Sequence, residues 1–209
     1  MGLLILLFLA VIYVLLASLL ISYIKPWWLR PFVAIIFIAI PTADAAYGRY
    51  RLHQMCNAES GLKIYRVVDN APGFYDPLNS PTEGWIKKYG YKYIEGRGPG
   101  GQLARMILKD DGAIDMEIGG QPISKYVYEF KHGNINDIYY RSEQTIYVKA
   151  TNEILSRAVN INYSGGWVER LLAAIYGERG SAENCGKDVG IEIFTKTLNP
   201  IRSNANQNN

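Results

Sequence analysis

The sequence has few of the residues and motifs that usually mark an enzyme. It contains only two histidines, His53 and His132, and neither belongs to an H-E-x-x-H or comparable zinc pattern. No serine lies in a G-x-S-x-G elbow, the turn on which many hydrolases carry their nucleophile. Two carboxylates distant in sequence could still meet in the fold, as glycosidase chemistry requires. The sequence therefore predicts a protein that is not an enzyme, with no catalytic residue, and a membrane-tethered enzyme without a recognisable motif is an alternative.

Patterns for metals, phosphates and nucleic acids are also missing. The glycine-rich stretch 96–101 has neither the Lys-Ser/Thr ending of a P-loop nor the spacing of a dinucleotide-binding fingerprint, so we interpret it as a loop between strands. Turn chemistry and strand alternation explain the four clustered acidic residues, which lack the ligand spacing of an EF-hand. These residues are Asp110, Asp111, Asp115 and Glu117. The formal net charge is only +3, with both signs interspersed. We expect no metal, no cofactor and no nucleic-acid partner.

Cysteine is scarce, and its two positions lie far apart. Cys56 and Cys185 are the only cysteines, and each stands in a short, mostly polar stretch of the kind found in surface loops. This arrangement is typical of a single long-range disulfide in an oxidising compartment. Two buried free thiols are the alternative interpretation. We predict a disulfide bond between Cys56 and Cys185.

A long apolar run is present at the start of the chain. Residues 3–24 are almost wholly apolar, broken only by two serines and two tyrosine rings. The run is long enough for a helix to cross roughly 30 Å of hydrocarbon. It lacks the polar face of a core helix in a soluble protein and the basic start and cleavage site of a signal peptide. The pattern predicts a transmembrane helix.

A second apolar segment follows after a basic and aromatic turn. Two prolines in this turn suit the end of one helix and the start of the next. Residues 32–40 are apolar, and a helix over 27–47 is long enough to cross a bilayer. The sequence therefore predicts a two-helix transmembrane hairpin over residues 1–47. Indole rings and cations suit the lipid head groups, so four residues are predicted at the membrane interface: Lys25, Trp27, Trp28 and Arg30.

The same segment has a rival interpretation as a cleaved signal. Residues 25–30 would then be the basic region, 32–40 the hydrophobic region, and Ala43-Asp44-Ala45 the cleavage site.

Two signals disagree on the side of the membrane that holds the C-terminal domain. Cations soon after the second helix favour the cytoplasm, whereas the cysteine pair favours the outside, and long ectodomains translocate largely regardless of flanking charge. We predict an integral protein of the bacterial inner membrane with its C-terminal domain outside the cytoplasm.

Residues 48–198 are predicted to form one extracytoplasmic α+β domain with a mainly antiparallel sheet. Alternating segments recur about every ten residues with turn signals between them. The clearest hairpin joins 103–109 to 113–118 through Asp111-Gly112. Residues 69–80 are expected to be a loop, 131–134 a turn and 141–143 a break between two strands. Further strands are predicted over 62–68, 91–95, 124–130, 138–140, 145–150, 154–163 and 189–198.

Two short helices are predicted within this domain. The capping box Ser80-Pro81-Thr82-Glu83 predicts a helix over 81–89 that ends at Gly90, with Trp85, Ile86 and Tyr89 as its buried stripe. Helical spacing of apolar residues predicts a second helix over 167–176, followed by Gly177. Residues 199–209 are polar and are predicted to be a disordered tail.

The abundance of tyrosine carries the functional hypothesis. The sequence contains 16 tyrosines but only 6 phenylalanines, which is typical of a sheet with one solvated face or of a binding surface. The candidate partner-binding surface comprises Trp85, Tyr89, Tyr91, Tyr93 and Arg97. We expect a membrane-anchored, non-enzymatic accessory protein that recognises a protein partner at the cell envelope. An immunity or superinfection-exclusion factor and a ligand sensor are further alternatives.

Overall fold

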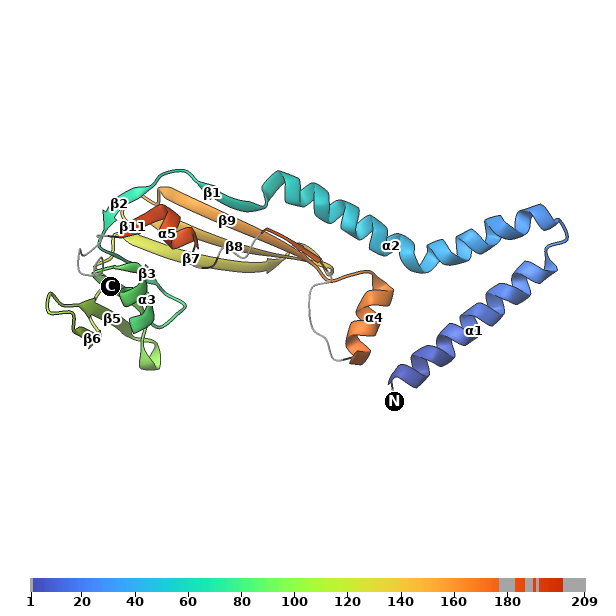
Figure 1. Cartoon of the computed structure of the whole chain (residues 1–209), viewed down its shortest axis with the longest axis horizontal. Coiled ribbons are helices and arrows are strands. Elements are labelled where there is room, and N and C mark those ends of the chain that lie inside the picture. The colour runs from blue at the N-terminus through green and yellow to red at the C-terminus, as the bar shows by residue number, and fades with distance from the viewer. Residues whose placement is uncertain (1, 177–182, 187–189, 191, 201–209) are drawn as a thin grey trace, which may run out of the picture. The chain divides into compact units, whose positions relative to one another are not determined.

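The structure is a computed structural model that describes residues 2–176, 183–186, 190 and 192–200. It is a mixed α+β protein with a large, mostly antiparallel sheet and several helices (Figure 1). The elements in chain order are α1 (Gly2–Tyr23), η1 (Trp27–Leu29), α2 (Arg30–Glu59), β1 (Gly61–Ile64), β2 (Val68–Ala71), β3 (Gly73–Asp76), α3 (Glu83–Tyr89), β4 (Tyr93–Arg97), η2 (Pro99–Gly101), β5 (Leu103–Leu108), β6 (Ile114–Ile118), β7 (Tyr126–Asn134), β8 (Tyr139–Val148), β9 (Ile154–Tyr163), α4 (Trp167–Tyr176), β10 (Glu183–Cys185), α5 (Glu192–Thr197) and β11 (Leu198–Pro200).

The chain divides into two compact units, which are described separately. One unit contains residues 1–58, 134–140 and 161–185, and is called the helical unit because α1, α2 and α4 belong to it. The other contains residues 59–133, 141–160 and 186–209, and is called the sheet unit. The division falls within the long strands β7, β8 and β9.

The main sheet has the strand order β1-β9-β8-β7-β3-β4-β5-β6, and β10 also pairs with β9. The central strand β3 runs parallel to β4 and β7. The pairs β4–β5, β5–β6, β1–β9 and β9–β10 are antiparallel. A separate parallel pair joins β11 to β2. The expectation of an α+β fold with a mainly antiparallel sheet is confirmed at this level.

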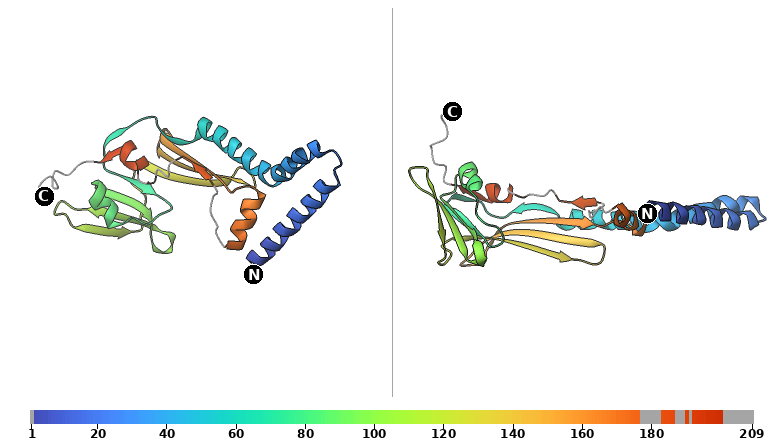
Figure 2. Two further views of the ribbon diagram at one scale, coloured as in Figure 1. Left: turned by 45° about the vertical axis from the view of Figure 1, so that its right-hand side comes forward. Right: turned by 90° about the horizontal axis from the view of Figure 1, so that it is seen from below.

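The sheet unit is built around an aromatic core. Phe74 of β3 lies 4.4 Å from Phe194 of α5 and 5.2 Å from Tyr91, measured between ring centroids. Trp85 of α3 contacts the same Phe194 ring at 5.3 Å, which places α3 and α5 on one face of the sheet (Figure 2). Ile86, Ile146, Leu155 and Leu198 are also fully buried. Burial of each such side chain contributes on the order of 1.5–3 kcal/mol, so this cluster is the main source of stability for the unit.

Several expected loops and breaks are strands in the structure. Residues 69–80 contain most of β2 and all of β3, although both strands have only four residues and no alternation that a sequence pattern can show. The predicted break at 141–143 lies inside the ten-residue strand β8, because Arg141 and Glu143 pair with charged neighbours and so remain in the sheet. The predicted turn at 131–134 is the last part of β7.

The C-terminal strand predicted over 189–198 is wrong for most of its length. Glu192–Thr197 is the helix α5, and only Leu198 belongs to the following strand β11. Ile193, Phe194 and Thr197 are buried on one face of this helix. Its single turn is too short to show a clear helical period in the sequence. Asn199 and Pro200, the first two residues of the predicted tail 199–209, belong to β11. The rest of that tail, residues 201–209, lies outside the described residues, as do residues 189 and 191 and Gly177.

The helix α3 starts differently from the prediction. It begins at Glu83 with Thr82 at the N-cap, and no side chain caps it. The Ser80 hydroxyl instead donates to the carbonyl oxygen of Arg97 at 2.6 Å, and Glu83 pairs with Lys87. The predicted capping box is therefore absent. The predicted end is confirmed, because Gly90 adopts a left-handed conformation with φ of 76°.

The N-terminal helices differ from the prediction mainly at the end of α2. This helix continues beyond Tyr47 to Glu59, so Cys56 lies on a helix and not in a loop. No single helix among the described side chains is long and apolar enough to cross a membrane; the apolar helix Val11–Tyr23 is shorter than a span. Trp27–Phe37 and Thr42–Glu59 together have the required length and composition, but they are bent by 54°.

Candidate functional site

The residues predicted to bind a partner mostly belong to the core of the sheet unit. Tyr91 is fully buried, and its hydroxyl donates to the carbonyl oxygen of Leu198 at 2.9 Å. Trp85 and Tyr89 are half-buried and pack against this core. Tyr93 is half-buried on β4, and only Arg97 is exposed. Tyr91 is therefore not available to a partner, because it lies between α3 and β4 and its ring packs against Phe74 in the core.

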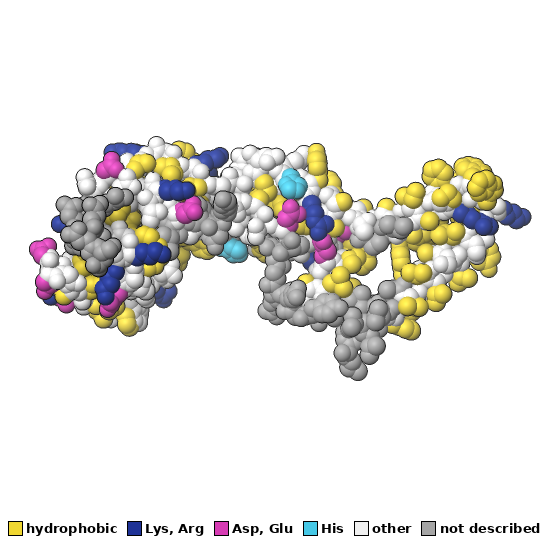
Figure 3. Space-filling model, in the orientation of Figure 1, with side chains coloured by type: hydrophobic (Ala, Val, Ile, Leu, Met, Phe, Trp, Pro, Cys, Tyr) yellow, Lys and Arg dark blue, Asp and Glu magenta, His cyan; other side chains and the backbone are white. Residues whose placement is uncertain are grey.

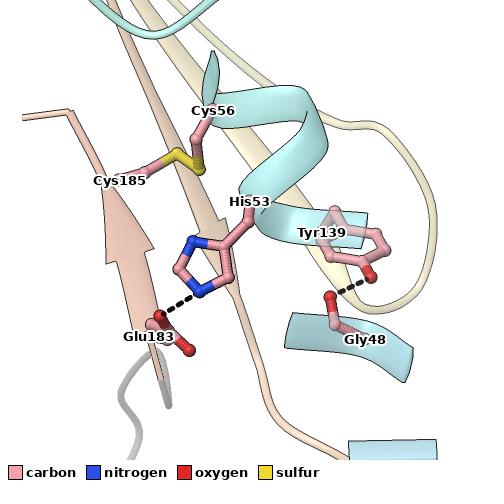
Figure 4. The surroundings of a disulfide bond; sticks show 6 residues. All are labelled: Gly48, His53, Cys56, Tyr139, Glu183 and Cys185. Atoms are coloured by element: carbon pink, nitrogen blue, oxygen red, sulfur yellow. Dashed lines mark hydrogen bonds and ion pairs between the residues drawn. A yellow bond between two sulfur atoms is a disulfide. The ribbon is translucent and has the colours of Figure 1, made fainter. Parts of the chain in front are cut away.

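The predicted cysteine pair is confirmed as a contact within the helical unit. The sulfur atoms of Cys56 on α2 and Cys185 on β10 lie at bonding distance, 2.00 Å, with 5.7 Å between their Cα atoms (Figure 4). Glu183, two residues before Cys185, pairs with Arg49 at 3.4 Å and with His53 at 3.5 Å. The last turns of α2 are therefore fixed to β10 by one covalent link, the Arg49–Glu183 ion pair and the close contact of His53 with Glu183.

A second group of contacts holds α2 against the strand ends in the same unit. The Tyr139 hydroxyl donates to the carbonyl oxygen of Gly48 at 2.7 Å (Figure 4). The Tyr163 ring lies so close to Gly48 that any Cβ atom there would overlap its hydroxyl. Tyr139 and Tyr163 are both buried, with ring centroids 5.3 Å apart. Burial raises the pKa of both hydroxyls, so these rings are neutral structural contacts.

A polar hollow lies in the sheet unit, over three adjacent strands. It has a volume of about 290 Å³, and its lining residues come from the end of α2 and from β1, β8 and β9. They are Glu59, Gly61, Lys63, Arg141, Arg157 and Val159. The sheet order β1-β9-β8 brings these residues together, and Lys63 lies opposite Arg157 in the β1–β9 register. We call this hollow the basic pocket.

The charges in the basic pocket do not balance. Arg157 binds Glu143 with two hydrogen bonds, from Nε at 2.6 Å and from Nη2 at 2.9 Å. Arg141 pairs with Glu59 at 2.7 Å and with Glu143 at 3.1 Å. Lys63 makes no ion pair with any residue that the structure describes. Three cations therefore face two carboxylates, which leaves one positive charge in excess.

The state of Glu143 is set by its two arginine partners. The hydrogen bond from Arg157 holds the pKa of Glu143 below its ordinary value, although partial burial acts in the opposite direction. Glu143 is therefore ionised near neutral pH and keeps both guanidinium groups in place. The Nε atom of Arg141 is buried and has no acceptor in the described part of the chain. An unpaired buried donor of this kind costs free energy in the folded state.

The buried carboxylate of Glu95 on β4 has several partners close by. Glu95 is buried, and its carboxylate accepts hydrogen bonds from Arg105 at 2.8 Å and from the backbone amides of Ile123 and Ser124 at 3.0 and 2.8 Å. This arrangement ties β4 and β5 to the segment before β7. Within the described residues, no group of three or more His, Cys, Asp or Glu side chains is placed to hold a metal ion. The clustered acids include Asp111, whose carboxylate accepts from the amide of Ala113 in the predicted hairpin turn.

The four predicted interface residues lie together at the turn between α1 and α2. Trp27 and Trp28 are 79% and 58% exposed, and Lys25 and Arg30 are exposed beside them. On the face shown in Figure 3, hydrophobic side chains cover the two helices and the cations gather near the turn. Among the described side chains of α1, only Ala17 is buried. The helical unit therefore exposes an extensive apolar surface, which is unusual in a protein surrounded only by water.

Comparison of the chain with protein-family models, with curated proteins and with solved structures finds no match. Two surfaces of the molecule remain as indications of function, the apolar helices and the basic pocket.

Proposed function

We propose that the protein is a membrane-anchored, non-enzymatic binding protein whose sheet unit recognises a protein partner outside the cytoplasm. The observation that carries this proposal is the outward apolar surface of α1 and of the first part of α2. Phe8, Leu15 and Leu19 of α1 are each more than half exposed, as are Phe32 and Ile36 of α2. Apolar side chains on every side of a helix suit a lipid environment and not an aqueous one.

The contacts between and within these helices also support a hairpin in lipid. The Tyr13 hydroxyl donates to the carbonyl oxygen of Phe37 at 2.5 Å, which joins α1 to α2. Ser18 and Ser22 donate to carbonyl oxygens of their own helix, Val14 at 2.8 Å and Leu19 at 2.7 Å. Every one of these hydroxyls thus has an internal acceptor, as polar groups in hydrocarbon require. In the sequence, Pro41 stands between the two segments of α2 that are bent relative to each other, and proline disfavours a continuous helix.

Two features favour placing the sheet unit outside the cytoplasm. A disulfide between Cys56 and Cys185 is stable in an oxidising compartment and rare in the cytosol. In a hairpin, both helix ends lie on one side of the membrane and the turn lies on the other. The turn carries Lys25 and Arg30, and cations close to membrane helices are enriched on the cytoplasmic side. The anchor would then hold the sheet unit near partners in the envelope.

The basic pocket is the proposed contact with that partner. It is open and carries one excess positive charge, and its Lys63 makes no ion pair within the described part of the chain. A carboxylate from an acidic partner segment would pair with this lysine. Because Arg141 and Arg157 are already held by Glu143, little side-chain entropy would be lost on binding. The pocket, rather than the buried Trp85–Tyr91 region, thus takes the role of the expected binding surface.

Thiol labelling of intact cells tests the anchor and the location of the sheet unit. An external disulfide predicts that an impermeant maleimide labels both cysteines only after treatment with an impermeant reductant. Labelling that needs cell lysis but no reductant would place the unit in the cytoplasm with free thiols, and would overturn the proposed location. Extraction of the full chain from membranes by carbonate would contradict the anchor itself.

Photo-crosslinking in intact cells tests the pocket. A photoreactive amino acid at position 63 should give one discrete adduct with a protein partner, whereas the same group at the exposed Lys92 should not. Arg157→Ala should abolish the adduct, because it removes a pocket cation and releases Glu143. Equal adducts at positions 63 and 92, or an adduct that survives Arg157→Ala, would contradict binding at the pocket.

A further inference from the structure

We infer that α4 is a second membrane contact, which lies in the head-group region with Trp167 and Leu171 directed toward the lipid. The inference rests on the proposed membrane anchor and adds a binding surface to it. It concerns a helix of the domain that follows the hairpin, where the sequence predicted no membrane contact. Its ligand is a phospholipid surface.

The side chains of α4 form an outward apolar stripe. Trp167 and Leu171, four residues apart and so on one helix face, are 48% and 40% exposed. Val168 and Leu172 are half-buried, and Glu169 faces α2, where it pairs with Arg49. Packing of α4 against its own unit therefore explains Val168 and Leu172 but not the exposed pair. A helix with one apolar face and one charged face is the usual form of an interfacial helix.

The first turn of α4 is fixed to α2 by unusually specific contacts. The carboxylate of Asp44 on α2 accepts a hydrogen bond from the amide of Trp167 at 2.6 Å. Glu169 accepts one from the amide of Gly166 at 2.8 Å and also pairs with Arg49. A Cβ atom at Gly166 would lie 2.9 Å from Cβ of Ala45, so the two backbones approach closely there. Asp44 thus caps a helix that begins 123 residues later in the chain.

These contacts place Trp167 beside the point where α2 would leave the hydrocarbon. The apolar part of α2 ends near Ile40, and Asp44 lies one helical turn later. Tyr47 and Tyr50 on α2 are 61% and 60% exposed, and aromatic rings of this kind mark membrane interfaces. From Trp28 to Tyr47 the helix path is roughly 30 Å, about the thickness of a bilayer core. Trp167 therefore lies at the same membrane surface as Tyr47 and Tyr50, opposite the surface that holds the turn between α1 and α2.

Two further observations favour lipid over a protein as the occupant of this stripe. First, α4 contacts α1 as well as α2, so it lies against both helices of the proposed anchor. Its exposed side chains therefore continue the apolar surface of that anchor. Second, Arg170 is exposed next to the stripe, where a cation can meet lipid phosphates. A partner protein or a second copy of the chain covering Trp167 is treated as an outcome of the test.

Quenching of tryptophan fluorescence by brominated lipids tests the inference directly. The chain has four tryptophans, so single-tryptophan variants of the full-length protein can retain only Trp27, Trp85 or Trp167, with phenylalanine at the other positions. Each is reconstituted into zwitterionic vesicles whose acyl chains carry bromine close to the head groups. Trp27 reports on the anchor, Trp167 on α4, and Trp85 is a control because it packs in the core of the sheet unit.

The expected result is strong quenching of Trp167 and Trp27 with none of Trp85. Leu171→Asp should reduce quenching of Trp167 without changing that of Trp27, whereas Arg170→Gln should change neither in zwitterionic lipid. Quenching of Trp27 but not Trp167 would overturn the inference and leave the anchor intact. Absence of quenching at both positions would overturn the anchor as well. Quenching of Trp167 that appears only on dilution of the protein in the vesicles would assign the stripe to a second copy and also overturn the inference.

Discussion

The sheet unit turns its large apolar side chains inward, whereas the helical unit turns most of its own outward. In the sheet unit, Phe74, Ile86 and Leu155 are fully buried. In the helical unit, Phe8, Leu15 and Trp27 are mostly exposed. Both units contain apolar residues, and those of the helical unit include the almost wholly apolar run 3–24. The direction in which these side chains point indicates that the two units are built for different surroundings.

The two units also depend on different stabilising contacts. Continuous packing between aromatic rings holds the sheet unit together. The described strand ends and α4 are attached to α2 by single contacts, namely the disulfide, the Arg49–Glu169 pair, the Tyr139–Gly48 hydrogen bond and the Asp44 cap. Among its described residues, the helical unit has only a small set of buried side chains, among them Leu52, Tyr139 and Tyr163. The individual contacts add to the packing of these side chains.

Loss of the disulfide should have the largest effect and should act first on the helical unit. Because Cys56 and Cys185 are 129 residues apart, the chain-entropy model gives about 5 kcal/mol of lost stability for Cys56→Ser with Cys185→Ser. Denaturant unfolding in detergent, with limited proteolysis near residue 56, measures the effect. A reductant should lower the midpoint of the wild type to that of the variant and leave the variant unchanged. Equal stability of the two proteins would show that the non-covalent contacts suffice.

Phe194→Ala should destabilise the sheet unit by about 3–5 kcal/mol, because the ring is buried against Phe74, Trp85 and Tyr128 and its loss leaves a cavity. Near-ultraviolet circular dichroism during urea unfolding measures the change. Phe130→Ala is the matched control, because this ring is 38% exposed and its removal should cost less than about 1 kcal/mol. Similar losses for both variants would contradict a core centred on Phe194.

Gly48→Ala should loosen the helical unit by about 1–3 kcal/mol, since the added Cβ atom would overlap the buried Tyr163 ring. Protection of the amides around Gly48 in hydrogen exchange should fall, while protection in β4 and β5 should not. Gly84→Ala in α3 is the control, because open space surrounds this position and alanine favours a helix by about 0.5–1 kcal/mol. Unchanged protection at Gly48→Ala would mean that α2 is not held at this point.

Acid should lower the free energy of unfolding of the sheet unit through Glu143 and Glu95. We expect this effect to be smaller than those of the substitutions above. The hydrogen bond from Arg157 lowers the pKa of Glu143, and hydrogen bonds to Glu95 from Ser124, Ile123 and Arg105 outweigh burial, which alone would raise its pKa. A carboxyl with a lowered folded-state pKa adds stability above its ordinary value of 4.5, and that contribution disappears as the pH falls through the folded-state pKa.

Unfolding midpoints between roughly pH 6 and pH 3 measure this dependence. Near pH 6, Glu143→Gln should have a lower unfolding midpoint than the wild type. The difference between the two midpoints should shrink as the pH falls. A difference that stays constant would mean that the ionised form of Glu143 contributes nothing.

Long, regular segments were predictable from the sequence because their patterns repeat. The strand β9 and the helix α4 have the predicted bounds, 154–163 and 167–176, since ten residues are enough to show a period. The hairpin of β5 and β6 was also predictable from its Asp-Gly turn, and Gly112 has the positive φ that such turns need. For β6, the alternation was predictable but the burial was not. Met116 and Ile118 alternate with polar residues, yet they are 48% and 52% exposed because β6 lies at the edge of the sheet.

Short elements and the basic pocket were not predictable in this way. β2 and β3 have four residues each, and α5 has six, so local pattern could not outweigh the tertiary packing that defines them. Lys63, Arg141 and Arg157 are far apart in sequence and meet only because β1, β9 and β8 are neighbours. The polar residues of β8 were the one available signal, but without the sheet order they were interpreted as a break. The cysteine pair was predictable because there are only two cysteines to join.

The bond between Cys56 and Cys185 also determines how the protein responds to a cut backbone. Most of the sheet unit, apart from the residues after Cys185, lies between these cysteines in the chain, so the bond closes the polypeptide into a covalent ring with α1 and most of α2 attached. One cleavage anywhere inside the ring opens it but releases no fragment. A protease would have to cut twice, or a reductant would have to act as well, before any part of the ring left the anchor.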